Sequence, residues 1–161
     1  MKVSSITNQK GGVGKTTSAI NIAYFVAKMG FRTLLIDFDP QGNATSDLGI
    51  DKNQLETTMS DVISGEKMLK DAIVDTGFAG LKLAPSTPIL ANTEVELANA
   101  NGRFTRLKNA IEIVRNDFDY VILDSPPSLS LLTVNGFIAS DYLVLPVQAE
   151  FYAMEGLGQL L

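Results

Sequence analysis

The stretch KGGVGKTT, residues 10–17, decides the fold of this chain. A short apolar segment, residues 3–7, precedes it, and an apolar-periodic segment starts at Lys15. This order predicts a strand, a glycine-rich turn and a helix, an arrangement in which backbone N–H groups and a helix N-terminus can bind phosphate. The glycines let the main chain curl around a phosphate group. The stretch therefore predicts a nucleotide-binding loop in an α/β fold.

The side chains of this loop fit the parts of a nucleoside triphosphate and its metal ion. Lys15 can reach the β- and γ-phosphate oxygens as a point charge, and the Thr16 hydroxyl suits Mg²⁺. Thr17 would add a contact to the α-phosphate. The common pattern GxxxxGK(S/T) requires glycine at position 9, where this chain has Gln9. The loop therefore departs from the ordinary pattern by one residue, and Lys10 is its unusual feature.

The rest of the chain alternates apolar strand patterns with helix patterns. Strands are expected at residues 3–7, 32–38, 81–84, 120–123 and 142–147, and helices at residues 15–29, 60–63, 89–100, 103–116, 128–139 and 153–161. Gly30 is expected to end the first helix, whereas residues 43–80 carry little pattern beyond their short helix. This alternation predicts a three-layer α/β fold of the P-loop NTPase type, with a mainly parallel twisted sheet flanked by helices. We expect a single domain over residues 1–161 that is truncated at its C-terminus, because the last helix lacks a capping signal.

Three aspartates follow the apolar strands. Asp37 lies near the end of the run at residues 32–38, Asp39 directly follows that run, and Asp124 follows the run YVIL at residues 120–123. Because the carboxyl ends of parallel strands form the crevice in which α/β proteins bind ligands, these carboxylates are expected beside the loop. The period-2 spacing of Asp37 and Asp39 directs both side chains to one face. Hydrolysis needs a carboxylate for the Mg²⁺ shell and a group that orients water, and these positions supply both.

The composition narrows the choice of metal, partner and compartment. The chain has no cysteine and no histidine, which excludes disulfides, cysteine-ligated zinc and iron–sulfur clusters held by this chain and leaves oxygen-ligated Mg²⁺. A net charge of −5 provides no global positive field for nucleic acid, so a DNA contact would need a local patch or further sequence. The N-terminus lacks an apolar signal-peptide region, and no stretch reaches about 18 apolar residues. We therefore expect a cytoplasmic protein that does not act at a membrane.

The loop and its aspartates resemble three motifs of the ParA/MinD family of ATPases. KGGVGKT at residues 10–16 resembles the deviant Walker A motif of that family, DFDPQGN at residues 37–43 resembles its Walker A′ motif, and YVILD at residues 120–124 resembles its Walker B motif. The resemblance implies that the whole loop contacts the nucleotide, through Lys10, Gly11, Gly12, Val13, Gly14, Lys15, Thr16 and Thr17.

The same resemblance implies a role for each polar side chain. Lys10, Lys15 and Asp39 are the catalytic candidates, with Lys10 reaching the nucleotide of a partner subunit and Asp39 orienting the attacking water. The metal candidates are Thr16, Asp37 and Asp124, of which Asp124 would hold Mg²⁺ through water.

The likeness to the partition ATPases ParA and Soj runs over essentially all 161 residues. It implies ATP/ADP and Mg²⁺ as cofactors, an ATP-dependent homodimer, a ParB-like activator and a nucleoid-associated protein of chromosome or plasmid partition. Nonspecific DNA binding is implied only for further C-terminal sequence. Residues 148–150 and 152–157 look like the segment that follows the next strand in the family, where packing and the subunit interface are expected.

Three other functions compete with this interpretation. A MinD-like ATPase shares the loop but works at a membrane through a C-terminal amphipathic helix, and the DPQGN segment at residues 39–43 favours the partition branch instead. A truncated nucleotide-binding module without turnover and a metabolic kinase are further alternatives, although Lys10 has no evident purpose in a kinase. The nitrogenase iron protein shares the loop but needs a cysteine-held cluster, which the absence of cysteine excludes.

Overall fold

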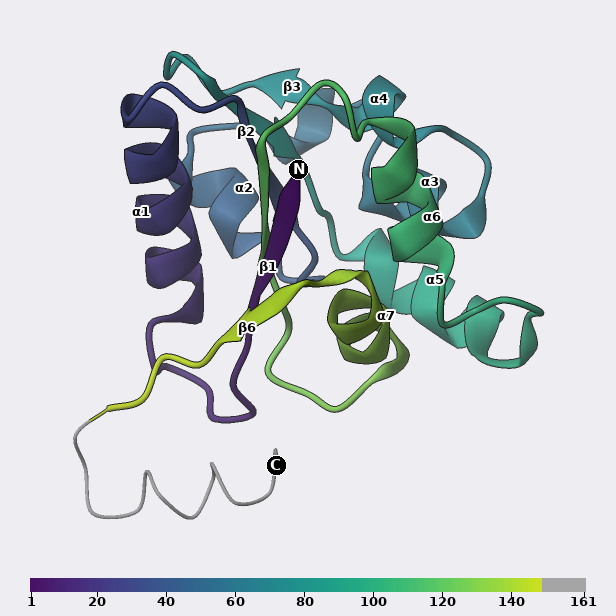
Figure 1. Cartoon of the computed structure of the whole chain (residues 1–161). Coiled ribbons are helices and arrows are strands. Elements are labelled where there is room, and N and C mark those ends of the chain that lie inside the picture. Colours follow the sequence, from purple (N-terminus) through teal and green to yellow (C-terminus); the bar gives the residue numbers. More distant parts are fainter. Residues whose placement is uncertain (149–161) are drawn as a thin grey trace.

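The structure is a computed structural model that describes residues 1–148, and its elements form three layers (Figure 1). The strands are β1 (Lys2–Ile6), β2 (Thr33–Asp37), β3 (Val74–Asp75), β4 (Leu81–Ala84), β5 (Tyr120–Asp124) and β6 (Tyr142–Val144). The helices are α1 (Lys15–Lys28), α2 (Asn43–Asp47), α3 (Met59–Ser64), α4 (Leu69–Ala72), α5 (Ile89–Glu96), α6 (Arg106–Ile113) and α7 (Leu131–Ala139), with 3₁₀ turns η1 (Lys52–Gln54) and η2 (Leu97–Asn99). The predicted α/β fold is confirmed.

Within the described residues the strands form one sheet in the order β3-β4-β2-β5-β1-β6. The pairs are parallel except for β3 with β4, as the prediction of a mainly parallel sheet requires. The central strand β5 pairs with β1 and with β2, and its last residue, Asp124, lies opposite both Ile6 and Asp37. The three strands therefore end level with one another, and the segments that follow them start at the same edge of the sheet.

Alternate residues of the central strands are buried against opposite layers. Leu34 and Ile36 of β2 belong to a core shared with α3, α5, α6 and α7, whereas Leu35 belongs to a second core shared with α1 and α2. In β5, Ile122 belongs to the second core and its two neighbours to the first. Figure 1 shows α1 and α2 on one face of the sheet and α3, α5, α6 and α7 on the other. Helices on both faces explain why these strands are apolar throughout.

Helix α1 packs on the sheet through small side chains. Ala19, Ala23 and Ala27 recur every four residues, lie on one face of the helix and are buried. Their small size lets the helix backbone approach the sheet closely. The helix ends at Lys28, and Gly30, with a left-handed φ of 96°, lies just beyond that end, which confirms its predicted place.

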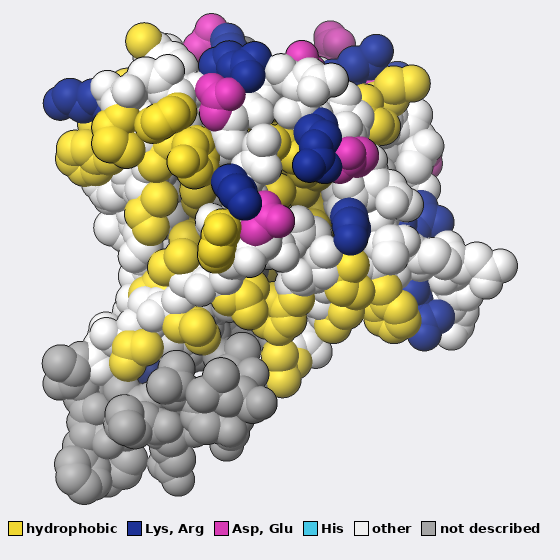
Figure 2. Space-filling model, viewed as in Figure 1, with side chains coloured by type: hydrophobic (Ala, Val, Ile, Leu, Met, Phe, Trp, Pro, Cys, Tyr) yellow, Lys and Arg dark blue, Asp and Glu magenta, His cyan; other side chains and the backbone are white. Residues whose placement is uncertain are grey.

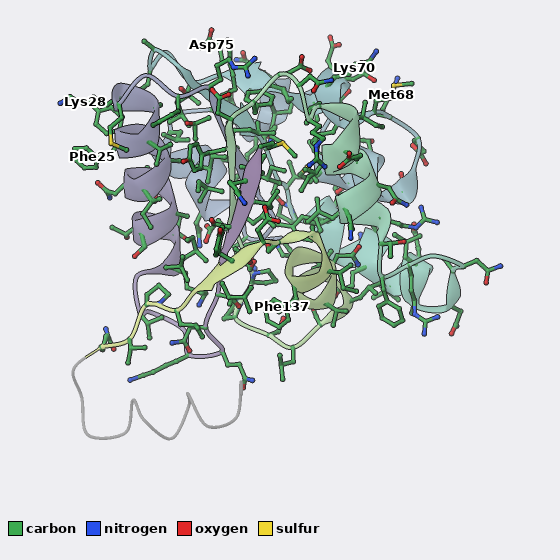
Figure 3. All side chains as sticks on the ribbon, in the orientation of Figure 1. Phe25, Lys28, Met68, Lys70, Asp75 and Phe137 are labelled. Atoms are coloured by element: carbon green, nitrogen blue, oxygen red, sulfur yellow. The ribbon has the colours of Figure 1, made fainter. Side chains whose placement is uncertain are left out.

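Two large apolar side chains are exposed at the C-terminal end of α1 and just beyond it, whereas Ile20, Ile22 and Tyr24 pack against the core. Phe25 and Met29 are 55% and 68% exposed. In Figure 3, Phe25 and Lys28 project outward from this helix, and Figure 2 shows hydrophobic side chains gathered over the same end of the molecule. Within residues 1–148, no helix combines the length and the apolar character needed to cross a bilayer.

Several helix ends differ from the predicted ones, for local reasons. Helix α6 begins at Arg106 rather than at residue 103, because Gly102 adopts a left-handed φ of 68° and prolongs the preceding turn. Helix α7 begins at Leu131 rather than at residue 128, because Ser130 is still extended. The helix expected at residues 89–100 changes to the 3₁₀ turn η2 for its last turn.

Three further predictions differ from the structure or lie outside the residues that it describes. β6 ends at Val144 rather than at residue 147, because its partner β1 also ends at that level, opposite Ile6. The segment 43–80 contains the predicted short helix as α3, but also α2, η1, α4 and β3, which its sequence pattern did not indicate. The helix predicted at residues 153–161 lies outside the described residues.

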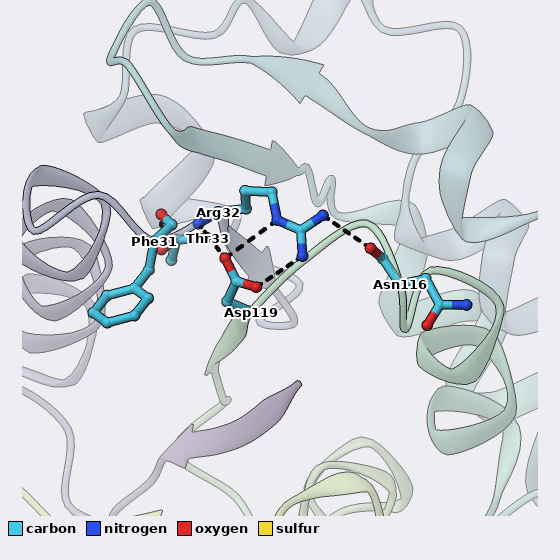
Figure 4. Close-up of polar contacts among 5 residues, drawn as sticks. All are labelled: Phe31, Arg32, Thr33, Asn116 and Asp119. Carbon is cyan, nitrogen blue, oxygen red and sulfur yellow. Dashed lines mark hydrogen bonds and ion pairs between the residues drawn. The ribbon is translucent and has the colours of Figure 1, made fainter.

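An ion pair joins β2 and β5 at the edge of the sheet opposite the glycine-rich loop (Figure 4). The Arg32 guanidinium donates from Nη2 to Asp119 Oδ1 at 2.7 Å and from Nε to Oδ2 at 3.2 Å, while its Nη1 donates to the Asn116 carbonyl at 2.9 Å. Hydrogen bonds from Arg32 lower the pKa of Asp119 to about 2. The pair holds the starts of two neighbouring parallel strands together.

Helix α7 is fixed to the helices beside it through its polar groups. Asn135 is buried at 1% exposure; its Nδ2 donates to the carbonyls of Arg103 and Leu131, and its Oδ1 accepts from the Leu107 N–H at 3.2 Å. In the first turn of α7, the Leu132 N–H donates to the Glu94 carboxylate of α5 at 3.0 Å. These contacts position α7 and the loop that leads into it from β5.

Replacing Asn135 by alanine should destabilise the fold. The change leaves the buried Leu107 N–H without its partner, which costs about 1–3 kcal/mol in the free energy of unfolding. Urea unfolding measures this cost. Asn21→Ala is the matched control, because its exposed side chain bonds only to the Thr17 carbonyl of its own helix, and we expect a change within about 0.5 kcal/mol. Equal effects of the two changes would contradict the role given to Asn135.

Candidate nucleotide-binding site

The glycine-rich loop connects the end of β1 to the start of α1, where the sequence predicted it. Gly12 and Gly14 have left-handed φ values of 74° and 85°, a conformation that costs glycine little and other residues more. Gly14 is the N-cap of α1 and makes no side-chain cap, so the first N–H groups of the helix face the loop without a capping side chain. The local geometry thus suits an anion.

A cavity of about 360 Å³ opens beside this loop. Its lining residues come from the loop, from the segment after β2 and from the segment after β5: Gly11, Gly12, Gly14, Lys15, Thr16, Thr17, Asp39, Gln41, Asn43 and Pro127. The cavity joins most of the predicted loop residues to Asp39. Gln41 and Asn43 were missed as lining residues, although their place in the DPQGN segment could have indicated them.

Lys15 is held inside the loop. It is 8% exposed, and its Nζ donates to the Lys10 carbonyl at 3.1 Å. Burial lowers the pKa of Lys15 from its usual value, while the negative charges of Asp124 and Asp39 raise it. A lysine that bonds to its own loop can exchange that carbonyl for a phosphate oxygen.

Asp124 is buried at the end of β5 with spare hydrogen-bonding capacity. It is 1% exposed, and among the described residues neither of its carboxylate oxygens has a hydrogen-bond partner. Burial raises the pKa of Asp124 to about 7; the charges of Asp37 and Asp39 raise it further, while the nearby Thr16 hydroxyl and Lys15 lower it. The Thr16 hydroxyl therefore lies near this carboxylate. A buried carboxylate beside a hydroxyl fits Mg²⁺, which prefers oxygen ligands.

Asp37 is buried at the same edge of the sheet, but its carboxylate already accepts hydrogen bonds from Thr45. Its Oδ2 accepts from the Thr45 N–H at 2.8 Å and from the Thr45 hydroxyl at 2.7 Å, and that hydroxyl accepts from the Ser86 N–H at 3.0 Å. Burial raises the pKa of Asp37 to about 6. These bonds tie the end of β2 to α2 and to the segment after β4. The role of Asp37 in the metal shell stays a prediction.

Asp39 begins the turn that leads from β2 to α2. Its Oδ1 accepts from the Gln41 N–H at 2.9 Å, and its carbonyl accepts from the Gly42 N–H at 2.9 Å. Lys52 donates to the Gln41 carbonyl at 2.8 Å from outside the turn. The turn therefore fixes the direction of the Asp39 carboxylate at the cavity wall.

Lys10 is exposed at the start of the loop and does not line the cavity.

A glycine-rich loop that joins a parallel strand to a helix N-terminus, beside an acidic strand end, is the arrangement of P-loop NTPases. A crystal structure described as cobyrinic acid a,c-diamide synthase from Mycobacterium smegmatis, with bound ATP analog and magnesium, superposes with a TM-score of 0.95 at 40% identity, covering 99% of this chain and 65% of that one. This chain has the P-loop NTPase fold.

Sequence comparison specifies the family within that fold. Residues 1–161 match the profile of the AAA domain family AAA_31, and the chain belongs to this family. It is 50% identical over 160 residues to the sporulation initiation inhibitor protein Soj of Bacillus subtilis and 47% identical over 163 residues to the chromosome partitioning protein ParA of Caulobacter vibrioides. These matches cover 99% and 100% of this chain but 63% and 61% of the relatives, so the chain spans about three fifths of their length.

The raised pKa of Asp124 predicts a pH dependence of stability in buffer without nucleotide or divalent ions. The pKa of Asp124 is about 7 in the folded state and about 4 in the unfolded state. Between these pH values the folded state keeps the proton on Asp124 while the unfolded state loses it, so the free energy of unfolding falls as the pH rises from about 4 to about 7. Asp124→Asn should therefore be more stable than the wild type at pH 8, by at most about 4 kcal/mol. Part of the slope should remain in Asp124→Asn, because the pKa of Asp37 is raised as well.

Urea unfolding at pH 5, 6, 7 and 8 measures this dependence, with Asp119→Asn as the control, which should keep the wild-type slope over this range. The pKa of Asp119 is lowered, so its contribution is present above the unfolded value and is lost as the pH falls toward 2. A wild-type slope that Asp124→Asn leaves unchanged would show that this carboxyl ionises normally in the folded protein.

Proposed function

We propose that this chain is the nucleotide-binding part of a ParA/Soj-type partition ATPase that binds and hydrolyses Mg-ATP. The observation that carries the proposal is the convergence of Lys15, Thr16, Asp39 and the buried Asp124 carboxylate at one edge of the sheet. Family membership, the names of the two relatives and the nucleotide-bound neighbour support it. Each of these groups has a distinct task in phosphoryl transfer.

The loop and Lys15 would bind the phosphates. Backbone N–H groups of the loop and of the first turn of α1 donate to phosphate oxygens, and Lys15 leaves the Lys10 carbonyl to add its positive charge. Thr16 and Asp124 would hold Mg²⁺, and the bound ion neutralises charge on the phosphate oxygens. Asp124 ionises in the process, because a nearby cation favours the charged carboxylate.

Asp39 would orient the attacking water. Gln41 holds one of its oxygens in the turn, so the carboxylate has a fixed direction and can accept a hydrogen bond from water at the cavity. Positioning and electrostatic stabilisation are the main contributions a protein makes to phosphoryl transfer, and Asp39 would supply the first.

The deviant Walker A role of Lys10 belongs to the same proposal. Lys10 is exposed and lies outside its own cavity wall, as expected of a side chain that acts on the nucleotide of a second subunit. We propose an ATP-dependent homodimer, activation by a ParB-like protein, and a cytoplasmic, nucleoid-associated role in plasmid or chromosome partition. DNA binding is proposed for the longer protein that the relatives exemplify.

Mg-ATP should stabilise the folded chain. At about 100 times the Kd the gain is roughly 2.7 kcal/mol, which corresponds to a rise in Tm of about 5 to 10 °C at this size. A thermal melt with and without Mg-ATP measures the rise, and Lys15→Ala should abolish it. Equal melting temperatures with and without Mg-ATP in the wild type would contradict the proposal for this chain.

Asp39→Ala should lose turnover and retain ATP. Loss of the water-orienting carboxylate lowers phosphate release by about 100-fold or more, while the Kd for ATP changes little. Asp39→Asn separates charge from structure, because its amide oxygen can still accept from the Gln41 N–H; we expect the same loss. Asp47→Asn, at the end of α2, is the control. Normal turnover in Asp39→Asn would show that the turn, rather than the carboxylate, matters.

The substrate of the reaction can be tested in the same assay. The mycobacterial neighbour is described as a diamide synthase, a name that implies a carboxylic acid acceptor. Phosphate release from Mg-ATP alone identifies hydrolysis, whereas release that requires an added acid and an amine donor identifies amide synthesis.

Size-exclusion chromatography of Asp39→Ala with ATP tests the dimer, which should accumulate when turnover is blocked.

A further inference from the structure

The segment that follows β6 lies against the glycine-rich loop, although about 130 residues of chain separate them. The β1–β6 ladder ends at Ile6 opposite Val144, and the Thr7 N–H then donates to the Val144 carbonyl at 3.0 Å. Figure 1 shows the segment after β6, in yellow, passing the loop between β1 and α1, in purple. Two side chains continue this contact beyond the ladder.

Asn8 joins the loop to the segment after β6 through both ends of its amide. Its Oδ1 accepts from the Lys10 N–H at 3.0 Å, and its Nδ2 donates to the Pro146 carbonyl at 2.8 Å. Asparagine is suited to this place because a single side chain must supply an acceptor to one neighbour and a donor to the other. Aspartate could supply only the acceptor.

Gln148 makes a second contact, four residues further along the loop. Its Nε2 donates to the Gly12 carbonyl at 3.2 Å. In a trans peptide, the carbonyl of one residue and the N–H of the next point in opposite directions. A donor that holds the Gly12 carbonyl on the β6 side therefore turns the Val13 N–H to the opposite side, and so fixes one peptide plane within the loop.

We propose that Asn8 and Gln148 form a clamp that holds residues 8–12 of the loop against the segment after β6, and that both are positioning residues for phosphate binding. The loop contains three glycines, whose ordering costs more conformational entropy than that of other residues. A loop that is ordered before the nucleotide arrives binds it more tightly, because less ordering remains to be done on binding. The effect on ATP rests on the proposed function, whereas the order of the loop does not.

Motion of the nucleotide-free loop tests the clamp directly. ¹⁵N relaxation of residues 10–14 should give order parameters near about 0.85 in the wild type and below about 0.6 in Asn8→Ala. Asn8→Asp is the informative variant, since it keeps the acceptor for the Lys10 N–H but offers Pro146 an oxygen in place of a donor. The clamp predicts the same loss of order in Asn8→Asp as in Asn8→Ala. A rigid loop in Asn8→Asp would show that the bond to Pro146 does not order it and would overturn the proposal.

Matched variants separate the clamp from general stability. Gln148→Glu keeps the shape of the side chain but loses the donor to Gly12, and it should free the loop in the same way. Asn116→Ala removes an exposed amide at the opposite edge of the sheet while keeping the carbonyl that Arg32 uses, and it should leave the loop rigid. A fall in order throughout the chain in the Asn8 variants would indicate a structural role only and would overturn the proposal.

Nucleotide affinity gives the functional consequence. Asn8→Ala and Gln148→Ala add no charge beside the phosphates and should each weaken Mg-ATP binding by about 3- to 10-fold, the worth of about one ordinary hydrogen bond, with little change in turnover at saturating ATP. Lys15→Ala reports on the proposed function instead. A wild type that does not bind ATP but has an ordered loop, loosened by these variants, would refute the function and keep the clamp.

Discussion

The site depends on the parallel pairing of β5 with both β1 and β2, which brings three strand ends to one level. Asp124 lies opposite Ile6 and Asp37, so the glycine-rich loop, the acidic turn and the Asp124 loop all leave the sheet together. The register is fixed at both edges: the Arg32–Asp119 pair joins the starts of β2 and β5, and the Phe38 N–H donates to the Asp124 carbonyl at their ends. A slip by one residue would turn each side chain to the opposite face.

The three aspartates at this edge differ in the hydrogen bonds that their carboxylates accept. Asp37 and Asp124 both have raised pKa values because burial penalises their charged forms. Asp37 is compensated by Thr45 and serves to hold α2, whereas Asp124 has no hydrogen-bond partner among the described residues. A carboxylate that destabilises the ligand-free fold and would be stabilised by a cation suits a binding group. Asp39 accepts one hydrogen bond in its turn and faces the cavity.

The loop itself is supported from parts of the chain that lie far apart in sequence. Lys15 bonds to the loop from within, while Asn8 and Gln148 connect it to the segment after β6. On the other side of the sheet, Asn135 and Glu94 fix α7, which follows the Asp124 loop. These contacts hold the glycine-rich loop at several points along its length.

The fold class, the parallel strands and the loop could be predicted from the sequence, because continuous apolar runs, a glycine-rich turn and Gly30 are local signals. It also indicated Asp39 as a site residue through its place after a strand. Tertiary contacts are needed to show that Thr45 occupies an oxygen of Asp37, that Asp124 has no hydrogen-bond partner among residues 1–148, and that Gln41 and Asn43 line the cavity. Hydrogen bonding and burial of this kind depend on which segments the sheet brings together, and no local pattern in residues 43–80 or around Asn8 carries that information.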